Sequence, residues 1–193
     1  MLRAGKWGGF GPKSMLGTEV SGKTLGIVGM GRIGQAVAHR GHYGFGMPVI
    51  YFNRSKKDAG LPARQVATLL DLMAEADIVV VTVPGGGPTT KLIDRAAIAA
   101  MKPTGIFVNI SRGEVVDEEA LIDALEAGAI AGAGLDVYEK EPHVPERLRA
   151  LENCTLLPHL GSATVETRQA MGQMALDNII AWDKGLEPPQ RVN

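Results

Sequence analysis

Three ionisable side chains in this sequence could together bind and protonate a small organic acid. Arg112 follows an apolar stretch and precedes Gly113. A guanidinium at the mouth of a cleft can hold a carboxylate through two parallel hydrogen bonds, although an arginine in a loop is as often a solvated surface group. His159 follows Pro158, and a carboxylate such as Glu141 beside an imidazole orients the ring and favours its protonated form. The three residues suggest a substrate clamp with an acid–base pair.

The remaining reactive side chains receive no role. His39, His42 and His143 lack a comparable setting, and a histidine near a helix start is more often structural, an alternative that holds for His159 as well. Cys154, the one cysteine of the chain, adjoins strand-like residues, so we expect a buried and unreactive thiol. We assign no metal ligand.

A glycine-rich turn could hold a second reactant beside these residues. The apolar run 25–28 is typical of a buried parallel strand and leads into Gly29, Gly31 and Gly34. A helix is expected at once over Arg32–His39. In a dinucleotide-binding turn the first glycine makes the turn, the second admits a pyrophosphate, and the third lets helix and strand pack closely. The helix N-terminus would then face the phosphates. The alternative is an ordinary strand–turn–helix connection.

The end of the next expected strand bears on which cofactor is bound. An acid that binds the ribose of NAD is expected about 20 residues past the glycine turn, but no acidic residue occurs there until Asp58. The strand is followed instead by Asn53, Arg54, Ser55, Lys56 and Lys57. A guanidinium, a hydroxyl and a lysine charge suit a 2′-phosphate, so NADP(H) is favoured and NAD(H) remains possible. The alternative is a solvated basic turn.

Alternating helical and strand-like stretches must position these residues. Strands are expected at 25–28, 48–52, 78–83, 106–110, 131–137 and 154–157. Helices are expected at 32–39, 65–75, 94–101, 118–127 and 164–182, with Asp117 as an N-cap and Gly128 as a stop. Strands separated by helices imply right-handed crossovers, so we predict an α/β fold with a doubly wound, Rossmann-type parallel sheet of six or seven strands.

Ligands of such sheets bind beyond the carboxyl ends of the strands. The residues just past those ends are 29–34, 53–57, 83–90, 111–112, 136–141 and 159–162, and they include most of the polar candidates. The sequence therefore predicts that the glycine turn, Arg112, Glu141 and His159 lie along one edge of the sheet.

Composition excludes several other classes of function. The 193 residues are 45% apolar with a net charge of −1, which argues against nucleic acid or a membrane surface as the partner. No apolar run is long enough to span a bilayer, and the glycine-rich N-terminus lacks a signal-peptide core. The single cysteine fits a reducing compartment, so we expect a soluble cytoplasmic protein.

Four motifs occur in a characteristic order: GMGRIG at 29–34, VNISRGEVVD at 108–117, GLDVYEKEP at 134–142 and LPHLGSAT at 157–164. In this order they resemble the D-isomer-specific 2-hydroxyacid dehydrogenase family, and the resemblance covers roughly residues 15–193. The chain is most similar to the glyoxylate and hydroxypyruvate reductase branch. The resemblance implies hydride transfer between NAD(P)H and a short 2-keto acid.

The resemblance also implies a role for each residue. Arg112 would bind the substrate carboxylate and carbonyl, His159 would protonate the carbonyl oxygen, and Glu141 would hold and charge His159. Asp136 would meet the nicotinamide carboxamide, and reduction would weaken as rising pH removes the proton of His159. With the residues of the turns included, the expected cofactor-binding set is Gly29, Gly31, Arg32, Ile33, Gly34, Asn53, Arg54, Ser55, Lys56, Val83, Pro84, Thr89, Ile110, Ser111, Arg112, Asp136, His159 and Gly161.

The chain departs from the family in length. Members of the family begin with a substrate domain, which we expect to be absent here, as in a truncated gene or a proteolysed product. We expect residues 1–15 to form an arm, 16–162 the NAD(P)-binding domain, and 163–193 a return helix and tail. The site would then lack one wall, so turnover by this chain alone should be weak or absent. The glycines of the helix end at 38–46 have no functional explanation.

Two further interpretations stay open. The chain could be a non-catalytic nucleotide-binding module, a sensor or corepressor-like protein, or a relative that acts on formate or phosphite. Trp7 and Phe10 lie on the coreless arm and suit burial against a second subunit, so a homodimer is expected. The alternatives are that they contact the absent domain or stay disordered.

Overall fold

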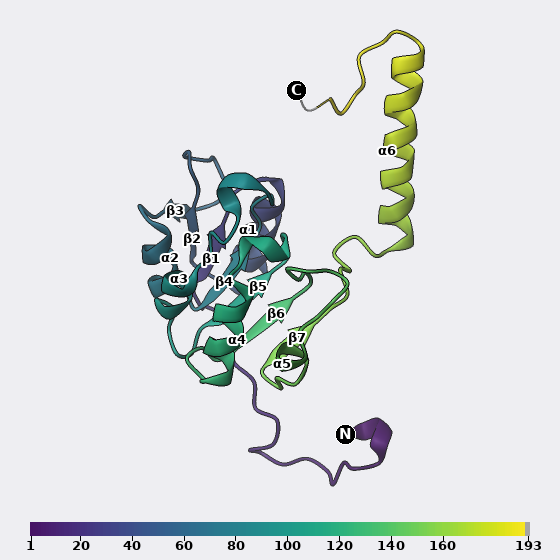
Figure 1. Cartoon of the computed structure of the whole chain (residues 1–193). Coiled ribbons are helices and arrows are strands. Elements are labelled where there is room, and N and C mark those ends of the chain that lie inside the picture. The colour runs from purple at the N-terminus through teal and green to yellow at the C-terminus, as the bar shows by residue number, and fades with distance from the viewer. Residues whose placement is uncertain (192–193) are drawn as a thin grey trace.

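A seven-stranded sheet forms the centre of the molecule, whose computed structural model describes residues 1–191 (Figure 1). The strands are β1 (Leu25–Val28), β2 (Val49–Phe52), β3 (Ala63–Gln65), β4 (Ile78–Val81), β5 (Ile106–Asn109), β6 (Gly132–Leu135) and β7 (Cys154–Leu156). Their order is β3-β2-β1-β4-β5-β6-β7, and every neighbouring pair is parallel. The carboxyl ends of all seven strands therefore share one edge, as predicted.

Helices cover both faces of the sheet. The helices of the chain are α1 (Arg32–Phe45), α2 (Leu69–Glu75), α3 (Arg95–Ala99), α4 (Glu118–Glu126), α5 (Glu146–Arg149) and α6 (Val165–Asp183), of which α6 stands away from the sheet (Figure 1). A Cβ built on Gly41 of α1 would lie 2.6 Å from Leu25, whereas one built on Gly26 would lie 2.7 Å from Ala76 at the end of α2. Successive strand residues point to opposite faces, so α1 and α2 lie on opposite sides. The predicted doubly wound α/β sheet is confirmed.

The core consists of two apolar layers, one on each face. Ile27 and Val28 are neighbours in β1 and both are fully buried, Ile27 in the layer beneath α1 and Val28 in the layer beneath α2 to α4. Burial on both faces explains why the strands of this parallel sheet are nearly continuous apolar runs. Burial of these apolar side chains stabilises the sheet, and the stable sheet fixes the position of the edge at which its strands end.

Side chains at the helix starts fix where the crossovers begin. Thr68 and Asp71 form a capping box on α2, and Asp94, Asp117 and Thr164 each accept a hydrogen bond from a backbone N–H in the first turn of α3, α4 and α6. The predicted N-cap at Asp117 is confirmed. These caps satisfy amides that would otherwise lack partners.

Three elements differ from the sequence-based expectation. The helix predicted over 65–75 begins only at Leu69 as α2, and Gln65 ends the unexpected strand β3, because Val66 donates its N–H to the Tyr51 carbonyl of β2 and Thr68 caps the helix. The short helix α5 was not expected. The helix after the glycine turn continues to Phe45 and ends at Gly46 in the left-handed region, with φ of 63°. The glycine-rich end is thus partly explained, since Gly41 contacts Leu25 without room for a side chain.

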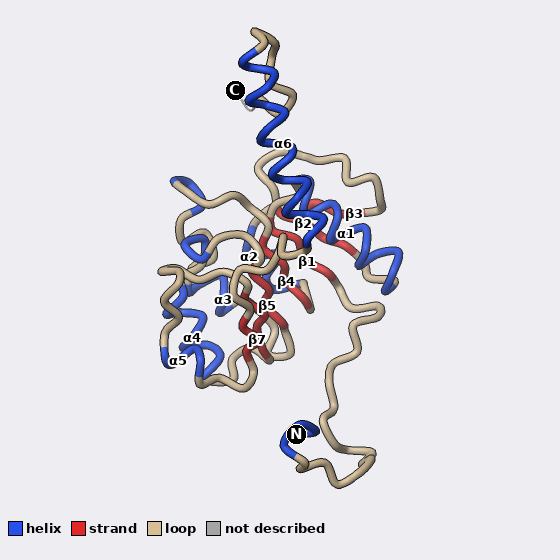
Figure 2. Tube along the Cα trace, turned by 90° about the vertical axis from the view of Figure 1, so that its right-hand side faces the viewer, coloured by secondary structure: helices blue, strands red, loops and turns tan. Residues whose placement is uncertain are grey.

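The N-terminal arm and α6 stand away from the sheet (Figures 1 and 2). α6 projects from one side of the molecule and the N-terminal arm from another (Figures 1 and 2). Within α6 only Ala181 is buried, while Met171, Ile179 and Trp182 are exposed. Among residues 1–191, none of the helices combines the length and apolar character needed to cross a bilayer.

Candidate active site

Two adjoining hollows lie at the carboxyl edge of the sheet. Their volumes are about 400 and 430 Å³, and they share Gly31, Thr82, Val83, Pro84 and Gly85. The first extends over the end of β2 to Asn53 and Arg54, and the second extends over the end of β5 to Ser111 and Arg112. The two form one cleft that crosses the sheet above β1 and β4, where the strand order reverses. This is the place at which open α/β sheets bind ligands.

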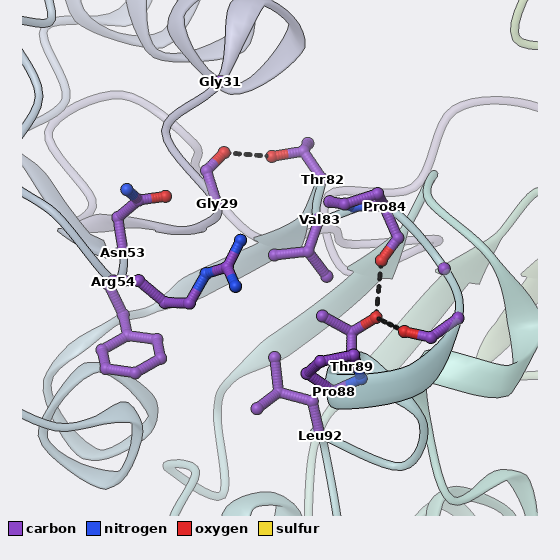
Figure 3. A pocket seen from close by; sticks show the side chains of 13 residues that line it. Gly29, Gly31, Asn53, Arg54, Thr82, Val83, Pro84, Pro88, Thr89 and Leu92 are labelled. Atoms are coloured by element: carbon purple, nitrogen blue, oxygen red, sulfur yellow. Dashed lines mark hydrogen bonds between the residues drawn. The ribbon is translucent and has the colours of Figure 1, made fainter. Parts of the chain in front are cut away.

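The glycine turn has the geometry that a dinucleotide requires. Gly29 has φ of 99°, and a Cβ on Gly34 would lie 2.2 Å from the Gly29 carbonyl oxygen, so strand and helix pack as only glycine permits. Thr82 holds the same carbonyl with a 2.6 Å hydrogen bond (Figure 3). Within residues 1–191, no atom lies within 4 Å of the Cβ position of Gly31, and no side chain caps the start of α1. The first amides of α1 therefore have no side-chain acceptor in this part of the chain, which fits a pyrophosphate.

The turn after β2 presents a guanidinium to the first hollow. Arg54 extends into it between Gly29 and Val83 (Figure 3), and within residues 1–191 it forms no ion pair. The Asn53 side chain donates to the Ser55 carbonyl at 2.8 Å and so shapes the turn. An unpaired guanidinium at this end of the cleft suits an anionic group.

A glycine loop forms the wall common to both hollows. The Thr89 hydroxyl donates to the Pro84 carbonyl at 2.7 Å and is 3.0 Å from the Gly86 carbonyl (Figure 3). The Glu114 carboxylate accepts the Gly86 N–H at 2.6 Å. A Cβ on Gly85 would lie 2.8 Å from Cγ of Arg112, so the loop backbone packs directly on the arginine stem. These contacts fix the loop relative to Arg112.

Arg112 stands on a turn that a buried amide shapes. Asn109, the last residue of β5, is 1% exposed. Its side-chain oxygen accepts the N–H of Ser111 at 3.0 Å and the Ser111 hydroxyl at 2.8 Å, and its amide donates to the Arg112 carbonyl at 3.0 Å. The side chain of Arg112 is exposed and lines the second hollow. Asn109 thus shapes the main chain of the turn, and Nη1 of Arg112 donates to the Ser111 carbonyl at 2.6 Å.

His159 and Glu141 form a hydrogen-bonded pair. Nδ1 of His159 lies 2.9 Å from Oε2 of Glu141, and the other carboxylate oxygen accepts the Tyr138 N–H at 3.0 Å. An ionised carboxylate only accepts, so Nδ1 donates and Nε2 is left for another partner. Burial would raise the pKa of Glu141, but the hydrogen bonds from His159 and Tyr138 and the charges of His159 and Arg112 outweigh it and hold that pKa below its usual value.

Asp136 fixes the backbone on which His159 stands. Its buried carboxylate accepts the N–H groups of Leu160 at 2.6 Å and Gly161 at 2.8 Å, and its carbonyl accepts the His159 N–H at 3.0 Å. His159 has φ of 54°, in the left-handed region that costs a non-glycine residue free energy. Three consecutive amides are held by one residue, which stabilises this conformation.

The expected site residues divide into two groups. Those lining the cleft are Gly29, Gly31, Arg32, Ile33, Asn53, Arg54, Val83, Pro84, Thr89, Ile110, Ser111 and Arg112. Those outside its lining are Gly34, Ser55, Lys56, Asp136, Glu141, His159 and Gly161. Gly34 lies beneath the glycine turn, and Ser55 and Lys56 are exposed residues of the turn that follows β2. The last four follow β6 and β7 at the same edge of the sheet. Their roles stay predictions.

Sequence reasoning missed several residues that shape the cleft. Thr82 and Leu92 line it, Asn109 shapes the Arg112 turn, and Glu114 holds the glycine loop. Only Thr82 and Asn109 carried a signal, as polar residues at the ends of apolar runs. Glu114 accepts a hydrogen bond from a residue 28 positions away, which no local pattern reveals.

Comparison with known proteins identifies the family. The model described as D-isomer specific 2-hydroxyacid dehydrogenase, NAD binding domain, matches residues 1–161. The chain is 46% identical over 198 residues to a glyoxylate reductase of Pyrococcus furiosus, which covers 100% of this chain and 59% of that protein. It is 50% identical over 196 residues to glyoxylate/hydroxypyruvate reductase B of Pectobacterium carotovorum, with 100% and 61% covered.

Solved structures agree. A putative D-isomer specific 2-hydroxyacid dehydrogenase from Polaromonas has a TM-score of 0.94 at 39% identity, covering 100% of this chain and 61% of that one. An NADPH-dependent glyoxylate/hydroxypyruvate reductase from Sinorhizobium meliloti, in complex with NADP and malonate, has a TM-score of 0.87 at 43% identity, covering 94% and 56%. The chain spans about three fifths of the length of these relatives. It belongs to the D-isomer specific 2-hydroxyacid dehydrogenase family, whose NAD-binding domain it matches.

Proposed function

We propose that this chain is the cofactor-binding and catalytic-residue domain of an oxidoreductase that transfers hydride between NADP(H) and a short 2-keto acid such as glyoxylate or hydroxypyruvate. The observation that carries the proposal is the 2.9 Å contact between His159 and Glu141. It lies at the sheet edge that also carries the glycine turn and Arg112. The names of the glyoxylate reductase relatives support the substrate class.

Each residue of the set has a distinct role in this proposal. The exposed guanidinium of Arg112 binds the substrate carboxylate bidentately and orients the carbonyl. Nε2 of His159 donates a proton to the carbonyl oxygen as negative charge develops there. Glu141 holds the ring in the tautomer that leaves Nε2 toward the substrate and favours the imidazolium form. A bound nicotinamide supplies the hydride.

The cofactor would lie across both hollows. The open amides at the start of α1, with Gly29 and Gly31, would hold the pyrophosphate. Arg54 would meet a 2′-phosphate, since its guanidinium reaches the first hollow and has no ion-pair partner among residues 1–191. A similar structure that holds NADP supports this preference over NAD(H). Ile110 and Ser111 would line the nicotinamide end.

Exposure of the site bears on turnover. The side chain of His159 is 48% exposed and that of Glu141 35%. Water at the reacting centre weakens electrostatic stabilisation of the transition state, so we expect the 193-residue chain to bind cofactor but to reduce 2-keto acids slowly.

Binding and turnover test the proposal separately. Calorimetry with NADPH and NADH measures cofactor binding, and oxidation of NADPH by glyoxylate or hydroxypyruvate measures the reaction at high enzyme concentration. Arg112→Ala and His159→Ala should abolish the remaining turnover while NADPH still binds. Binding with no turnover above that of these variants would favour a non-catalytic nucleotide-binding module instead.

The organisation of the chain forms part of the same proposal. We divide it into an arm at 1–15, a cofactor-binding domain at 16–162 and a helix with tail at 163–193. We further propose a cytoplasmic homodimer in which the arm packs on a second subunit, because Trp7 and Phe10 are exposed at 59% and 91%. Sedimentation equilibrium should then give twice the monomer mass, and Trp7→Ser with Phe10→Ser should return the monomer.

A further inference from the structure

The turn that carries Arg54 lacks the support that main-chain hydrogen bonds normally give. Residues 53–62, all of which the structure describes, form no backbone–backbone hydrogen bond. Most of these residues are exposed, and the hydrogen bonds that shape the turn join side chains to its main chain. Gln65 donates to the Asn53 carbonyl at 2.9 Å, and Gln35 reaches the Asp58 carbonyl at 3.3 Å.

Tyr51 is the buried member of this set. It lies in β2 with 2% of its surface exposed, packed in the layer beneath α1. Its phenol donates to the Lys57 carbonyl at 3.1 Å and accepts the Lys57 N–H at the same distance. One hydroxyl therefore satisfies both main-chain groups of Lys57 and closes the chain from β2 into a short loop whose middle is Arg54.

We propose that Tyr51 is the positioning residue that aims Arg54 into the cleft and thereby sets the preference for a cofactor with a 2′-phosphate. This inference rests on the proposed function. Tyr51 does not touch the hollow, so it acts through the loop alone. A guanidinium gives selectivity only where its fork meets the phosphate oxygens, and a loop that samples several positions loses that geometry.

The consequence is specific to one part of the cofactor. NADPH and NADH share the pyrophosphate and nicotinamide, and they differ only in the 2′-phosphate. A change confined to the Arg54 loop therefore alters the ratio of their affinities. A general loss of stability would weaken both cofactors alike, so the ratio separates positioning from mere structural support.

The test is Tyr51→Phe in the full 193-residue chain, with Kd for NADPH and NADH measured by calorimetry. The ring still fills its place in the core, so the fold should survive, as circular dichroism can check. We expect Kd for NADPH to rise about three- to tenfold and Kd for NADH to change by less than about twofold. The Lys57 amide should also exchange its hydrogen faster than in the unchanged protein, with no cofactor present.

Tyr138→Phe is the matched control. Tyr138 is also buried, at 7% exposure, and its phenol donates to a carbonyl, that of Leu157, at 2.9 Å. It follows β6, which three strands separate from β2 in the sheet, and it does not line the first hollow, so the affinity ratio should stay unchanged. An equal change in the ratio of the NADPH and NADH affinities in Tyr138→Phe would overturn the inference. Removal of any buried phenol hydroxyl would then be enough to change that ratio.

Arg54→Ala separates the two proposals. A preference for NADPH that Arg54→Ala abolishes and Tyr51→Phe retains overturns the role of Tyr51 and leaves the proposed cofactor intact. Equal affinity for NADPH and NADH in the unchanged chain refutes the proposed cofactor and the role of Tyr51 with it. Loss of the preference for NADPH over NADH in Arg54→Ala and Tyr51→Phe, but not in Tyr138→Phe, supports the proposed cofactor and the role of Tyr51.

Discussion

Gly113 packs directly against the main chain of Tyr138. A Cβ built on Gly113 would lie 1.9 Å from the Tyr138 carbonyl carbon and 2.0 Å from its oxygen. The contact joins the turn after Arg112 to the segment that holds Glu141, because the Tyr138 N–H bonds to the Glu141 carboxylate. The main-chain segments that carry two of the proposed catalytic side chains are thus held together by a contact that requires glycine.

Gly113→Ala should therefore destabilise the protein and disturb this junction. The added methyl cannot be accommodated without moving main chain, and overpacking of this kind costs about 1–3 kcal/mol or more. Urea unfolding followed by circular dichroism measures the change. Gly134→Ala in β6 is the control, since a Cβ there would meet only Val108 at 3.9 Å, an ordinary contact. Equal losses in the two variants would contradict the prediction.

The pair formed by Glu141 and His159 should show itself as acid sensitivity. Hydrogen bonds and nearby positive charge hold the pKa of Glu141 below its usual value in the folded protein. The ionised carboxylate therefore adds stability above the pKa of the unfolded chain, near 4.3, and this is lost as pH falls through the lower folded pKa. The amount should be under about 1 kcal/mol, because the pair is partly exposed.

Comparison of the unchanged protein with Glu141→Gln measures this effect. Urea unfolding at pH values from about 6 down to about 3 should give a steeper fall for the unchanged protein, since glutamine does not titrate. Identical slopes would show that the carboxylate is not paired in the folded state.

Asp136→Ala should release the loop that carries His159. The N–H groups of Leu160 and Gly161 lose their acceptors, at a cost of about 1–3 kcal/mol for each group left without a partner. Their hydrogen exchange, measured by nuclear magnetic resonance, should accelerate strongly. Asp58→Ala is the matched control, because Asp58 accepts the Gly60 N–H at 3.0 Å in an exposed turn. Protection of the two amides that persists in Asp136→Ala would refute this account of the loop.

Cys154 should react slowly in the native protein. Burial raises the pKa of its thiol to about 11, so very little reactive thiolate exists near neutral pH. The rate of modification by a disulfide reagent should be low at about pH 8, increase as pH approaches the raised pKa, and be much higher in urea. The side chain is half-buried rather than fully buried as expected, and rapid native modification at about pH 8 would contradict its low thiolate content.

Local patterns were sufficient for most of the fold and for much of the cleft. Gly29, Gly31 and Gly34 could be recognised because backbone geometry at such a turn excludes other residues. Continuous apolar runs marked strands covered on both faces, and that rule alone placed Arg54 and Arg112 at one edge. Short elements were harder to predict. Val66 fits the apolar spacing of a helix, and only the hydrogen bond from its N–H to the Tyr51 carbonyl shows that it continues from β3 instead.

Apart from the contact between Glu141 and His159, contacts between distant residues could not be predicted. Asp136 was expected to meet a nicotinamide, yet both carboxylate oxygens bind amides beyond β7, and its part in binding cofactor stays a prediction. Asn109 and Glu114 shape the cleft through tertiary hydrogen bonds. The exposed apolar residues of α6 carried a helical pattern but no indication of what they contact.

The turn at 53–62 has a consequence for how such a protein diverges over generations. Because residues 53–62 form no backbone–backbone hydrogen bond, substitutions there remove no pairing within the seven-stranded sheet. Selectivity for one dinucleotide over another can then drift or be redesigned by a few exchanges, at little cost in folding. The segments after β5, β6 and β7 tolerate fewer substitutions. Close glycine contacts and buried hydrogen-bond acceptors there hold one stretch of main chain against another.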